Sequence, residues 1–407
     1  MKKKLKILML VPFLPNIQTS GGQTRWYNII KYLSKNHDIT LFSLKKDESE
    51  KRFVPELKKY CKKVKVFSRP KSPWTLKNIL LAELGFYPLV VIRNFSFAEK
   101  KAVKKELEKE KYDLIHAEAF YVMPHISATN VPTILVEQTI EYMVYKHYVD
   151  NEVPLILKPL YMLDVLKLKF WEKYYWKKAD KLVAVSGEDR QAMQKLIPGI
   201  SVDIVPNGVD ADFYASKKLE KKDPPRVMYG VTNFEWLQNV EAVDLLIKKV
   251  WPKIHKEVPE AKLWIVGRRI PERIVKLSEE KSDIEVTESI EDARDAYLSA
   301  TVMVTPIKGS GGTRLKILEA MAAGLPVVST SIGVAGLDLK HGKQVLISDK
   351  VSGLAKQAVE VIRDKKLAEK IGEEGRKFVK ENFDWKVVVK RHDSIYDSVL
   401  KESRKKK

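Results

Sequence analysis

Short apolar runs alternate with helical patterns along the whole chain. The runs have the length of buried strands, whereas the segments between them repeat their apolar residues with the period of a helix. Strands are expected at residues 5–11, 39–44, 64–67, 114–117, 133–136 and 181–185, and then at 226–230, 262–266, 284–287, 302–305, 327–329 and 345–347. This alternation predicts an α/β protein with doubly wound, Rossmann-like parallel sheets.

The alternating pattern is interrupted once, which indicates two domains in a chain of 407 residues. We predict an N-terminal domain over residues 1–205, a linker over 206–225 and a C-terminal domain over 226–381. Residues 382–407 are expected to form a helix that packs back on the N-terminal domain, with an unstructured basic tail after Leu400. Because ligands bind at the carboxyl ends of parallel strands, the site is expected in a central cleft that both sheets face.

The segment 309–330 carries the most informative pattern. A glycine-rich turn follows the strand at 302–305, and a helix then runs to Gly324, a residue suited to a helix C-cap. A strand, a glycine turn, a helix and a second strand are the arrangement that aims a helix N-terminus at a phosphate. The alternative is an ordinary crossover whose glycines only allow close packing.

Charged residues in this helix favour the phosphate interpretation. Thr313 is the expected N-cap, and Arg314 and Lys316 place two cations in the first turn, where the helix dipole favours anions. A bound anion would remove that conflict. Glu319 lies about 9 Å from Thr313 along the helix axis. This is close to the distance from a diphosphate to the hydroxyls of its ribose. The segment therefore predicts a site for a nucleotide-diphosphate sugar.

Composition limits where the protein acts. The net charge is +21, and residues 1–205 carry 36 Lys and Arg against 22 Asp and Glu. The basic first half suggests an anionic partner, although a Lys/Glu-rich surface is the simpler explanation of the overall excess. A single cysteine, Cys61, excludes an intrachain disulfide and suits a reducing compartment. No apolar stretch approaches the length of a membrane span, so we expect a cytoplasmic protein that is soluble or peripheral to the inner face of the membrane.

Two segments of the first half combine apolar and basic residues. Residues 159–178 mix leucine, phenylalanine, tryptophan and tyrosine with lysine, and residues 74–92 are strongly apolar. Aromatic residues beside lysines on a helix are typical of a membrane interface. The alternative is that both segments bury their apolar faces in the core of the first domain. If they contact a membrane, the molecule on which the protein acts is expected to be linked to a lipid.

Five stretches together resemble the GT-B-fold retaining glycosyltransferases, in particular glycosyltransferase family four. They are Gly21-Gly22, Val183-Ala-Val-Ser186, Val205-Pro-Asn-Gly-Val-Asp210, Gly309 to Glu319 and Gly333-Val-Ala-Gly-Leu337. Gly21-Gly22 is expected as a loop before a helix that starts near Thr24. The resemblance implies transfer of a sugar from a nucleotide-diphosphate sugar with retained anomeric configuration, no essential metal and no further cofactor. It also implies that Glu319 holds the donor ribose, while Arg314 and Lys316 neutralise the leaving diphosphate. The donor residues expected are Gly21, Gly22, Thr232, Asn239, Gly311, Gly312, Thr313, Arg314, Lys316 and Glu319.

The sequence departs from that family at three places. Gly311 stands where the family has a glutamate that contacts the transferred sugar, and the usual Arg and Lys after the strand at 226–230 are absent, which leaves Thr232 and Asn239. The histidine often found after the strand at 133–136 is replaced by Gln138, which can position a hydroxyl but cannot act as a base.

Acceptor activation is therefore assigned to other candidates in the first domain. Glu137 and Glu141 are the candidates for activating the acceptor, and Glu137 is also a catalytic candidate together with Gln138, which could position a hydroxyl. His116 is a further candidate on the acceptor side. For the two glutamates the alternative is a surface carboxylate that caps a loop. For His116 it is a buried structural histidine.

Other classes of function have weaker support. No histidine pairs with Cys, Asp or Glu at metal-ligand spacing, so no metal site is predicted. The substitutions at Gly311 and Gln138 leave open a catalytically impaired partner subunit that still binds nucleotide sugars. A nucleic-acid-binding protein is favoured only by the charge, and no recognisable nucleic-acid motif is present.

Overall fold

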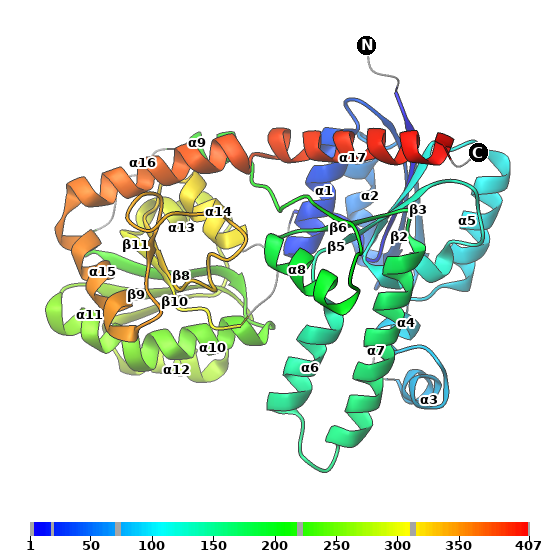
Figure 1. Ribbon diagram of the computed structural model, residues 1–407. Helices are drawn as coiled ribbons and strands as arrows, with labels where there is room; N and C mark the ends of the chain where they lie inside the picture. Colours follow the sequence, from blue (N-terminus) through cyan, green and yellow to red (C-terminus); the bar gives the residue numbers. More distant parts are fainter. Residues whose placement is uncertain (1–3, 18–19, 70–74, 218–222, 310–314, 406–407) are drawn as a thin grey trace. The chain divides into compact units, whose positions relative to one another are not determined.

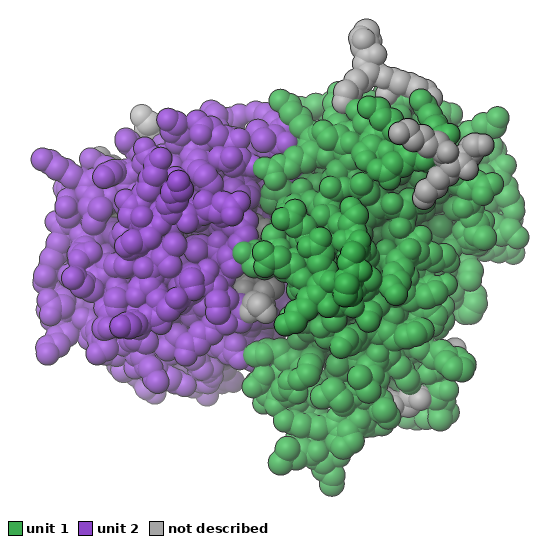
Figure 2. Space-filling model, in the orientation of Figure 1, with its two compact units in different colours: residues 1–206, 389–407 green, residues 207–388 purple. Residues whose placement is uncertain are grey.

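The computed structural model describes residues 4–17, 20–69, 75–217, 223–309 and 315–405, which form two compact units (Figure 2). Unit 1 comprises residues 1–206 and 389–407, and unit 2 comprises residues 207–388. Each unit is built on one parallel sheet with helices packed around it (Figure 1). The α/β class and the two doubly wound, Rossmann-like sheets predicted from the sequence are confirmed.

The sheet of unit 1 has seven strands in the order β3-β2-β1-β4-β5-β6-β7. The strands are β1 (Lys6–Val11), β2 (Asp38–Lys45), β3 (Lys63–Ser68), β4 (Leu114–Glu118), β5 (Thr133–Glu137), β6 (Lys181–Ala184) and β7 (Val202–Ile204). The helices are α1 (Gly21–Leu33), α2 (Val54–Leu57), α3 (Leu76–Leu84), α4 (Leu89–Arg93), α5 (Phe97–Lys109), α6 (Glu141–Glu152), α7 (Lys158–Lys178) and α8 (Gly187–Leu196), with 3-10 turns η1 (Glu48–Phe53) and η2 (Phe120–His125).

The sheet of unit 2 has six strands in the order β10-β9-β8-β11-β12-β13. The strands are β8 (Arg226–Asn233), β9 (Lys262–Arg268), β10 (Ile284–Thr287), β11 (Val302–Thr305), β12 (Val327–Ser329) and β13 (Leu346–Ile347). The helices are α9 (Ala211–Ala215), α10 (Leu237–Leu245), the π turn η3 (Leu246–Val250), α11 (Trp251–Glu257), α12 (Glu272–Glu280), α13 (Ala293–Ser299), α14 (Leu315–Ala322), α15 (Val351–Arg363) and α16 (Lys365–Asn382).

Both faces of the unit 2 sheet are covered. Alternate residues of a strand point to opposite faces, and Val227 and Tyr229 of β8 belong to one buried cluster while Met228 between them belongs to another. The same alternation separates Ile265 from Trp264 on β9. Strands buried on both faces read as continuous apolar runs, which explains why the sequence predicted them well.

Two local predictions need correction. Gly21 and Gly22 were expected as a loop before a helix starting at residue 24, but they form the first turn of α1 because the Ser20 side chain accepts the N–H of Gln23 as an N-cap. The tail after Leu400 was expected to be unstructured, but helix α17 (Trp385–Lys405) extends into it as far as Lys405.

Helix α17 returns to unit 1 through buried contacts. Residues 389–407 belong to unit 1, where the Tyr396 hydroxyl lies 2.6 Å from Nδ1 of His116 on β4. Both side chains are fully buried. A hydrogen bond between buried polar groups at this sequence separation fixes the helix on the sheet, because breaking it leaves two groups without water or partner.

Helix α14 ends as the sequence predicts. Gly324 has a φ of 77°, a left-handed conformation that glycine adopts without strain. The Arg376 guanidinium from α16 donates to the carbonyl of Ala323 at 2.8 Å and occupies the space beside Gly324. This junction fixes the C-terminal end of the helix that carries Lys316 and Glu319.

Substitution of Gly324 tests this junction. In Gly324→Ala a Cβ would lie 2.3 Å from Nη2 of Arg376, so the guanidinium must move and lose its bond to Ala323. Gly342→Ala is the matched control, because Gly342 has a φ of 73° and no atom within 4 Å of the Cβ position. We expect about 1–2 kcal/mol of destabilisation from backbone conformation in both variants and about 1 kcal/mol more in Gly324→Ala, measured by urea unfolding.

The extra cost should disappear in an Arg376→Ala background, where the new Cβ has room. Equal destabilisation by the two alanines in the wild-type background would show that Arg376 does not secure the end of α14.

Candidate functional site

The strand order of unit 2 reverses between β8 and β11. Chain segments leaving the carboxyl ends of these neighbouring strands turn to opposite faces of the sheet, so a crevice opens between them where ligands of open α/β sheets bind. Helix α10 follows β8, and α14 follows β11. Side chains from these elements are therefore the candidates for a donor site.

Lys316 brings three of these elements together. Its Nζ lies 2.5 Å from Oδ1 of Asn239 on α10, 3.2 Å from the Tyr229 hydroxyl and 3.4 Å from Oγ1 of Thr232 on β8. Asn239 is held in turn, since its amide donates to the carbonyl of Asn233 at 2.8 Å. The sequence proposed Thr232, Asn239 and Lys316 separately, and the fold places them in one cluster with a largely buried ammonium group.

Glu319 lies one turn further along α14 in a partly buried setting. The Tyr297 hydroxyl donates to its Oε2 at 2.8 Å, and Tyr214 also hydrogen-bonds to the carboxylate. Burial raises the pKa of Glu319 above its usual value, although both tyrosines and the nearby charge of Lys316 act in the opposite direction. The carboxylate thus accepts hydrogen bonds from two tyrosines, but these do not fully replace the stabilisation that water would give its charge.

The loop after β11 passes close to α10. A Cβ at Gly309 would lie 2.8 Å from Cγ of Gln238, so this approach requires glycine. The predicted donor residues Gly311, Gly312, Thr313 and Arg314 follow immediately but lie outside the described residues. Their assignment stays a prediction from the sequence.

A second polar cluster occupies the corresponding position in unit 1, where the strand order reverses between β1 and β4. Glu118 ends β4 and is fully buried; it accepts from the Trp26 indole at 2.8 Å and the Gln138 amide at 3.3 Å, and lies 2.9 Å from Nε2 of His116. Burial alone would raise the pKa of Glu118, but His116, Arg25 and Trp26 together lower it below its usual value.

This cluster reaches the start of α1. A Cβ at Gly22 would lie 3.1 Å from Oε1 of Gln138, so the glutamine side chain lies directly against the first turn of the helix. The neighbouring Arg25 is fully buried and donates to the carbonyls of Val205 and Pro206 at 3.0 and 2.7 Å. Gly22 and Gln138, assigned from the sequence to the donor and to the acceptor side respectively, are thus neighbours in the fold. Whether Gly21, Gly22 and Gln138 contact substrate stays a prediction.

The remaining acceptor-side candidates lie deeper in unit 1. His116 is fully buried between Glu118 and Tyr396, which matches the structural alternative. Glu137 is buried, with Oε1 accepting from the N–H of Phe120 and the Trp176 indole. Burial and the neighbouring Glu172 raise the pKa of Glu137 well above its usual value.

Glu141 lies near this group at the start of α6. Glu172 accepts from its N–H at 2.6 Å, and burial raises the pKa of Glu141. The roles of His116, Glu137 and Glu141 on an acceptor stay predictions, because no contact in the structure involves a ligand.

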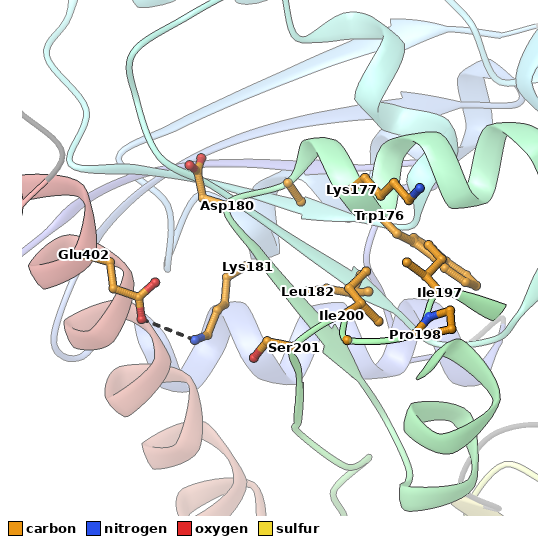
Figure 3. Close-up of a pocket in the computed structure, with 12 residues that line it drawn as sticks. Trp176, Lys177, Asp180, Lys181, Leu182, Ile197, Pro198, Ile200, Ser201 and Glu402 are labelled. Carbon is orange, nitrogen blue, oxygen red and sulfur yellow. Dashed lines mark ion pairs between the residues drawn. The ribbon is translucent and has the colours of Figure 1, made fainter. Parts of the chain in front are cut away.

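A surface hollow in unit 1 lies at the opposite edge of the sheet (Figure 3). It is lined by the end of α7, the start of β6 and the loop before β7, and contains an ion pair between Lys181 and Glu402 at 3.5 Å. Since Lys181 and Ser201 mark the amino ends of β6 and β7, this hollow is not where a doubly wound sheet binds its ligand.

The described part of the chain contains neither a metal-binding cluster nor a helix suited to span a membrane. Its His, Cys, Asp and Glu side chains include no group of three or more arranged to hold a metal ion. None of its helices has the length and apolar character needed to cross a bilayer.

Comparisons with known families match both halves of the chain. The family described as Glycosyltransferase Family 4 matches residues 19–213, and the family described as Glycosyl transferases group 1 matches residues 225–364. An uncharacterized 44.6 kDa protein in the cps region of Klebsiella pneumoniae is 24% identical over 98% of this chain and 100% of its own length. N-acetyl-alpha-D-glucosaminyl L-malate synthase of Bacillus anthracis is 24% identical over 73% of this chain and 77% of its own.

Solved structures share the fold. WaaG, a glycosyltransferase involved in lipopolysaccharide biosynthesis, superimposes with a TM-score of 0.65 at 14% identity, covering 96% of this chain and 99% of WaaG. Anabaena Alr3699/HepE, solved in complex with UDP, gives a TM-score of 0.64 at 16% identity, covering 97% of this chain and 100% of HepE.

Two parallel α/β units with polar clusters at the switch points of their sheets define a GT-B-type glycosyltransferase. The chain belongs to the glycosyltransferases that combine a Glycosyltransferase Family 4 domain with a Glycosyl transferases group 1 domain.

Several residues of these clusters were not anticipated from the sequence. Tyr214 and Tyr297, which contact Glu319, lie far from it in sequence and belong to α9 and α13. Nothing in their local sequence marks them. Glu118 had a usable signal, because it lies two residues after His116 on a strand and must therefore point to the same face.

The raised pKa of Glu319 predicts a pH-dependent cost. A carboxyl with a higher pKa in the folded state contributes stability that is complete below its unfolded pKa and is lost as the pH rises toward the folded value. Glu319→Gln removes that loss while retaining an acceptor for Tyr297. We therefore expect its melting temperature to fall less than that of the wild type as the pH rises from about 4 to 8.

The matched control is Glu369→Gln, an exposed glutamate on α16, which should leave the pH profile of the melting temperature unchanged. A parallel, equally steep decline in Glu319→Gln and the wild type would contradict the pKa direction.

Proposed function

We propose that this protein transfers a sugar from a nucleotide-diphosphate sugar to a glycan or lipid-linked acceptor, with retention of configuration and without an essential metal ion. The observation that carries this proposal is the cluster of Lys316 with Tyr229, Thr232 and Asn239 at the switch point of the second sheet. HepE, which shares the fold, has been solved with UDP. A relative named for capsular polysaccharide biosynthesis, CapM of Staphylococcus aureus, is 27% identical over 36% of this chain and 40% of its own length.

In the proposed reaction the bond between the anomeric carbon and the diphosphate breaks, and an acceptor oxygen bonds to that carbon on the same face. The diphosphate leaves with the electron pair, so negative charge grows on its oxygens, and the proton released by the acceptor hydroxyl passes to one of these oxygens. Lys316, together with Arg314 as predicted from the sequence, is assigned to stabilise this charge, which is the role of a fixed cation in a site that excludes water.

Glu319 is assigned to the ribose of the donor nucleotide. A ribose hydroxyl would donate to the carboxylate and supply the stabilisation that burial removes, which lowers the pKa of Glu319 on binding. Thr232 and Asn239 keep Lys316 in place through the contacts described above. On the acceptor side, Gln138 is assigned to orient a hydroxyl from its position beside Gly22 and Glu118.

Titration calorimetry with UDP-, GDP- and ADP-sugars tests the donor site. Lys316→Gln keeps most of the side-chain volume but loses a charge-assisted hydrogen bond of about 1.5–3 kcal/mol, so we expect affinity for the preferred donor to fall about 10- to 150-fold. Glu319→Ala should also weaken binding. Lys356→Gln, an exposed lysine of α15 in the same unit, is the matched control.

Unchanged donor affinity in Lys316→Gln, with a normal melting temperature, would place the nucleotide elsewhere. Tight binding by the wild type without turnover on any acceptor would instead favour the impaired partner subunit that the substitutions at Gly311 and Gln138 suggest.

The stereochemistry and the metal requirement are tested together. With the donor that binds best and a panel of free and lipid-linked glycans, we expect NMR to show a product with the anomeric configuration of the donor. Turnover should be unchanged within about twofold in excess EDTA, since Lys316 and Arg314 are assigned the charge stabilisation that a metal would otherwise provide. An inverted product, or activity that requires added Mg²⁺ or Mn²⁺, would contradict these two parts of the proposal.

A further inference from the structure

Exposed apolar side chains are concentrated in one region of unit 1. Among the described residues, fifteen of the twenty large apolar side chains that are exposed lie within residues 76–86 and 143–174. These segments contain α3, α6 and α7. Single exposed apolar residues are ordinary, but a concentration of this kind marks a surface that contacts something other than water.

Helix α7 has two apolar faces. One face is buried against unit 1 and includes Val165, Leu168 and Trp176. The opposite face points to solvent and carries an apolar stripe at helical spacing: Leu160, Leu163, Leu166, Phe170 and Tyr174. At about 1.5 Å per residue this stripe extends roughly 21 Å. An apolar stripe at helical spacing is the kind of face that a helix normally buries, and here its five side chains are 43–60% exposed.

The apolar surface continues into the loop before α7. Figure 1 shows α6 and α7 as a hairpin that projects from unit 1, with its connecting loop at the far end. In this loop Leu155 is 82% exposed and Ile156 is 87% exposed. The base of the loop is firm, because Val149, Val153 and Val165 pack together between the two helices. Two large apolar side chains are therefore presented at the tip of a rigid hairpin.

Helix α3 adjoins the hairpin and adds exposed leucines. The Lys167 ammonium donates to the carbonyl of Ala82 at 2.6 Å, and the Trp171 indole donates to the carbonyl of Phe86 at 2.6 Å. The ring of Trp171 also stacks on that of Tyr87 at 4.3 Å. On this attached segment the exposed apolar residues are Leu76, Leu80, Leu81, Leu84 and Phe86.

The surface charge of α7 has one sign. Its two acidic residues are buried and satisfied internally: Asp164 accepts the N–H of Leu89, and Glu172 accepts the N–H groups of Glu141 and Tyr142. The charged side chains that α7 leaves at the surface are all lysines: Lys158, Lys167, Lys169, Lys173, Lys177 and Lys178. Lys177 and Lys178 continue the exposed stripe one turn beyond Tyr174.

We propose that the α6–α7 hairpin and α3 form a docking surface for an anionic lipid bilayer. Apolar side chains flanked by lysines suit the interface of such a bilayer, where the leucines and Phe170 enter the acyl boundary and the lysines meet lipid phosphates. A second copy of the chain fits less well. A symmetric contact would place the same lysine-rich surface on both sides, and like charges would then face one another.

Vesicle flotation with the full chain tests this surface. We expect the wild type to float with vesicles of phosphatidylcholine and phosphatidylglycerol, and much less with phosphatidylcholine alone. The double variant Leu155→Ser/Ile156→Ser should reduce partitioning at least tenfold, because it removes both apolar residues at the tip. The triple variant Lys173→Gln/Lys177→Gln/Lys178→Gln should reduce binding to the anionic vesicles about tenfold and lower its salt dependence.

Matched controls use unit 2. Phe213→Ser removes an exposed apolar side chain from α9, and Lys356→Gln/Lys365→Gln/Lys366→Gln removes the same number of positive charges from α15 and α16. Both should float as the wild type does. The proposal would be overturned if the wild type did not float with anionic vesicles, or if the hairpin variants floated as well as the wild type. It would also be overturned by a dimer in analytical ultracentrifugation that the hairpin variants abolish while vesicle binding is absent.

Membrane docking and donor binding are separable. Glu319→Ala should float normally, and the hairpin variants should bind the nucleotide sugar with wild-type affinity. Failure of one result therefore leaves the other standing.

Discussion

The reversal of strand order in each sheet is the constraint on which both candidate sites depend. In unit 2 the crossovers that follow β8 and β11 leave toward opposite faces, which brings Lys316, Thr232 and Asn239 to one edge. In unit 1 the reversal between β1 and β4 gathers Glu118 with residues of α1 and β5 in the same way. Neither cluster is contiguous in sequence, so each exists only because the parallel sheet brings its residues together at the carboxyl ends of neighbouring strands.

The sequence predicts the scaffold better than the sites. Every strand expected from an apolar run is present, and the three-residue strand β7 (Val202–Ile204) was missed because Asp203 interrupts its apolar run. Gly324 was recognised as a helix end because its conformation is a local property. Lys316 and Glu319 were found through the turn that precedes them. By contrast, the tyrosines around Glu319 come from α9 and α13, and no local rule connects them to α14.

Helix α7 shows why a helix with two apolar faces is ambiguous in sequence. Its leucines and aromatic residues were compatible with core packing or with an interface, and the structure shows one set buried and an opposite set exposed. Apolar periodicity alone cannot tell the buried face from the exposed one, because apolar residues occur on both faces of the helix. The positions of Asp164 and Glu172 resolve the matter, since both acids turn inward and leave lysines outside.

The carboxylates of Glu118 and Glu319 differ in how far the folded protein stabilises their charge. Glu118 has the Trp26 indole, the Gln138 amide and His116 around it, and its pKa is lowered, so the folded protein already stabilises its charge. Glu319 has tyrosine hydroxyls, yet burial still raises its pKa. A group whose charged form is left under-stabilised benefits from an additional donor, and perturbed carboxyls of this kind gather at functional sites. The contrast supports the proposed assignment of Glu319 to the donor nucleotide, whereas the charge of Glu118 is already stabilised within unit 1.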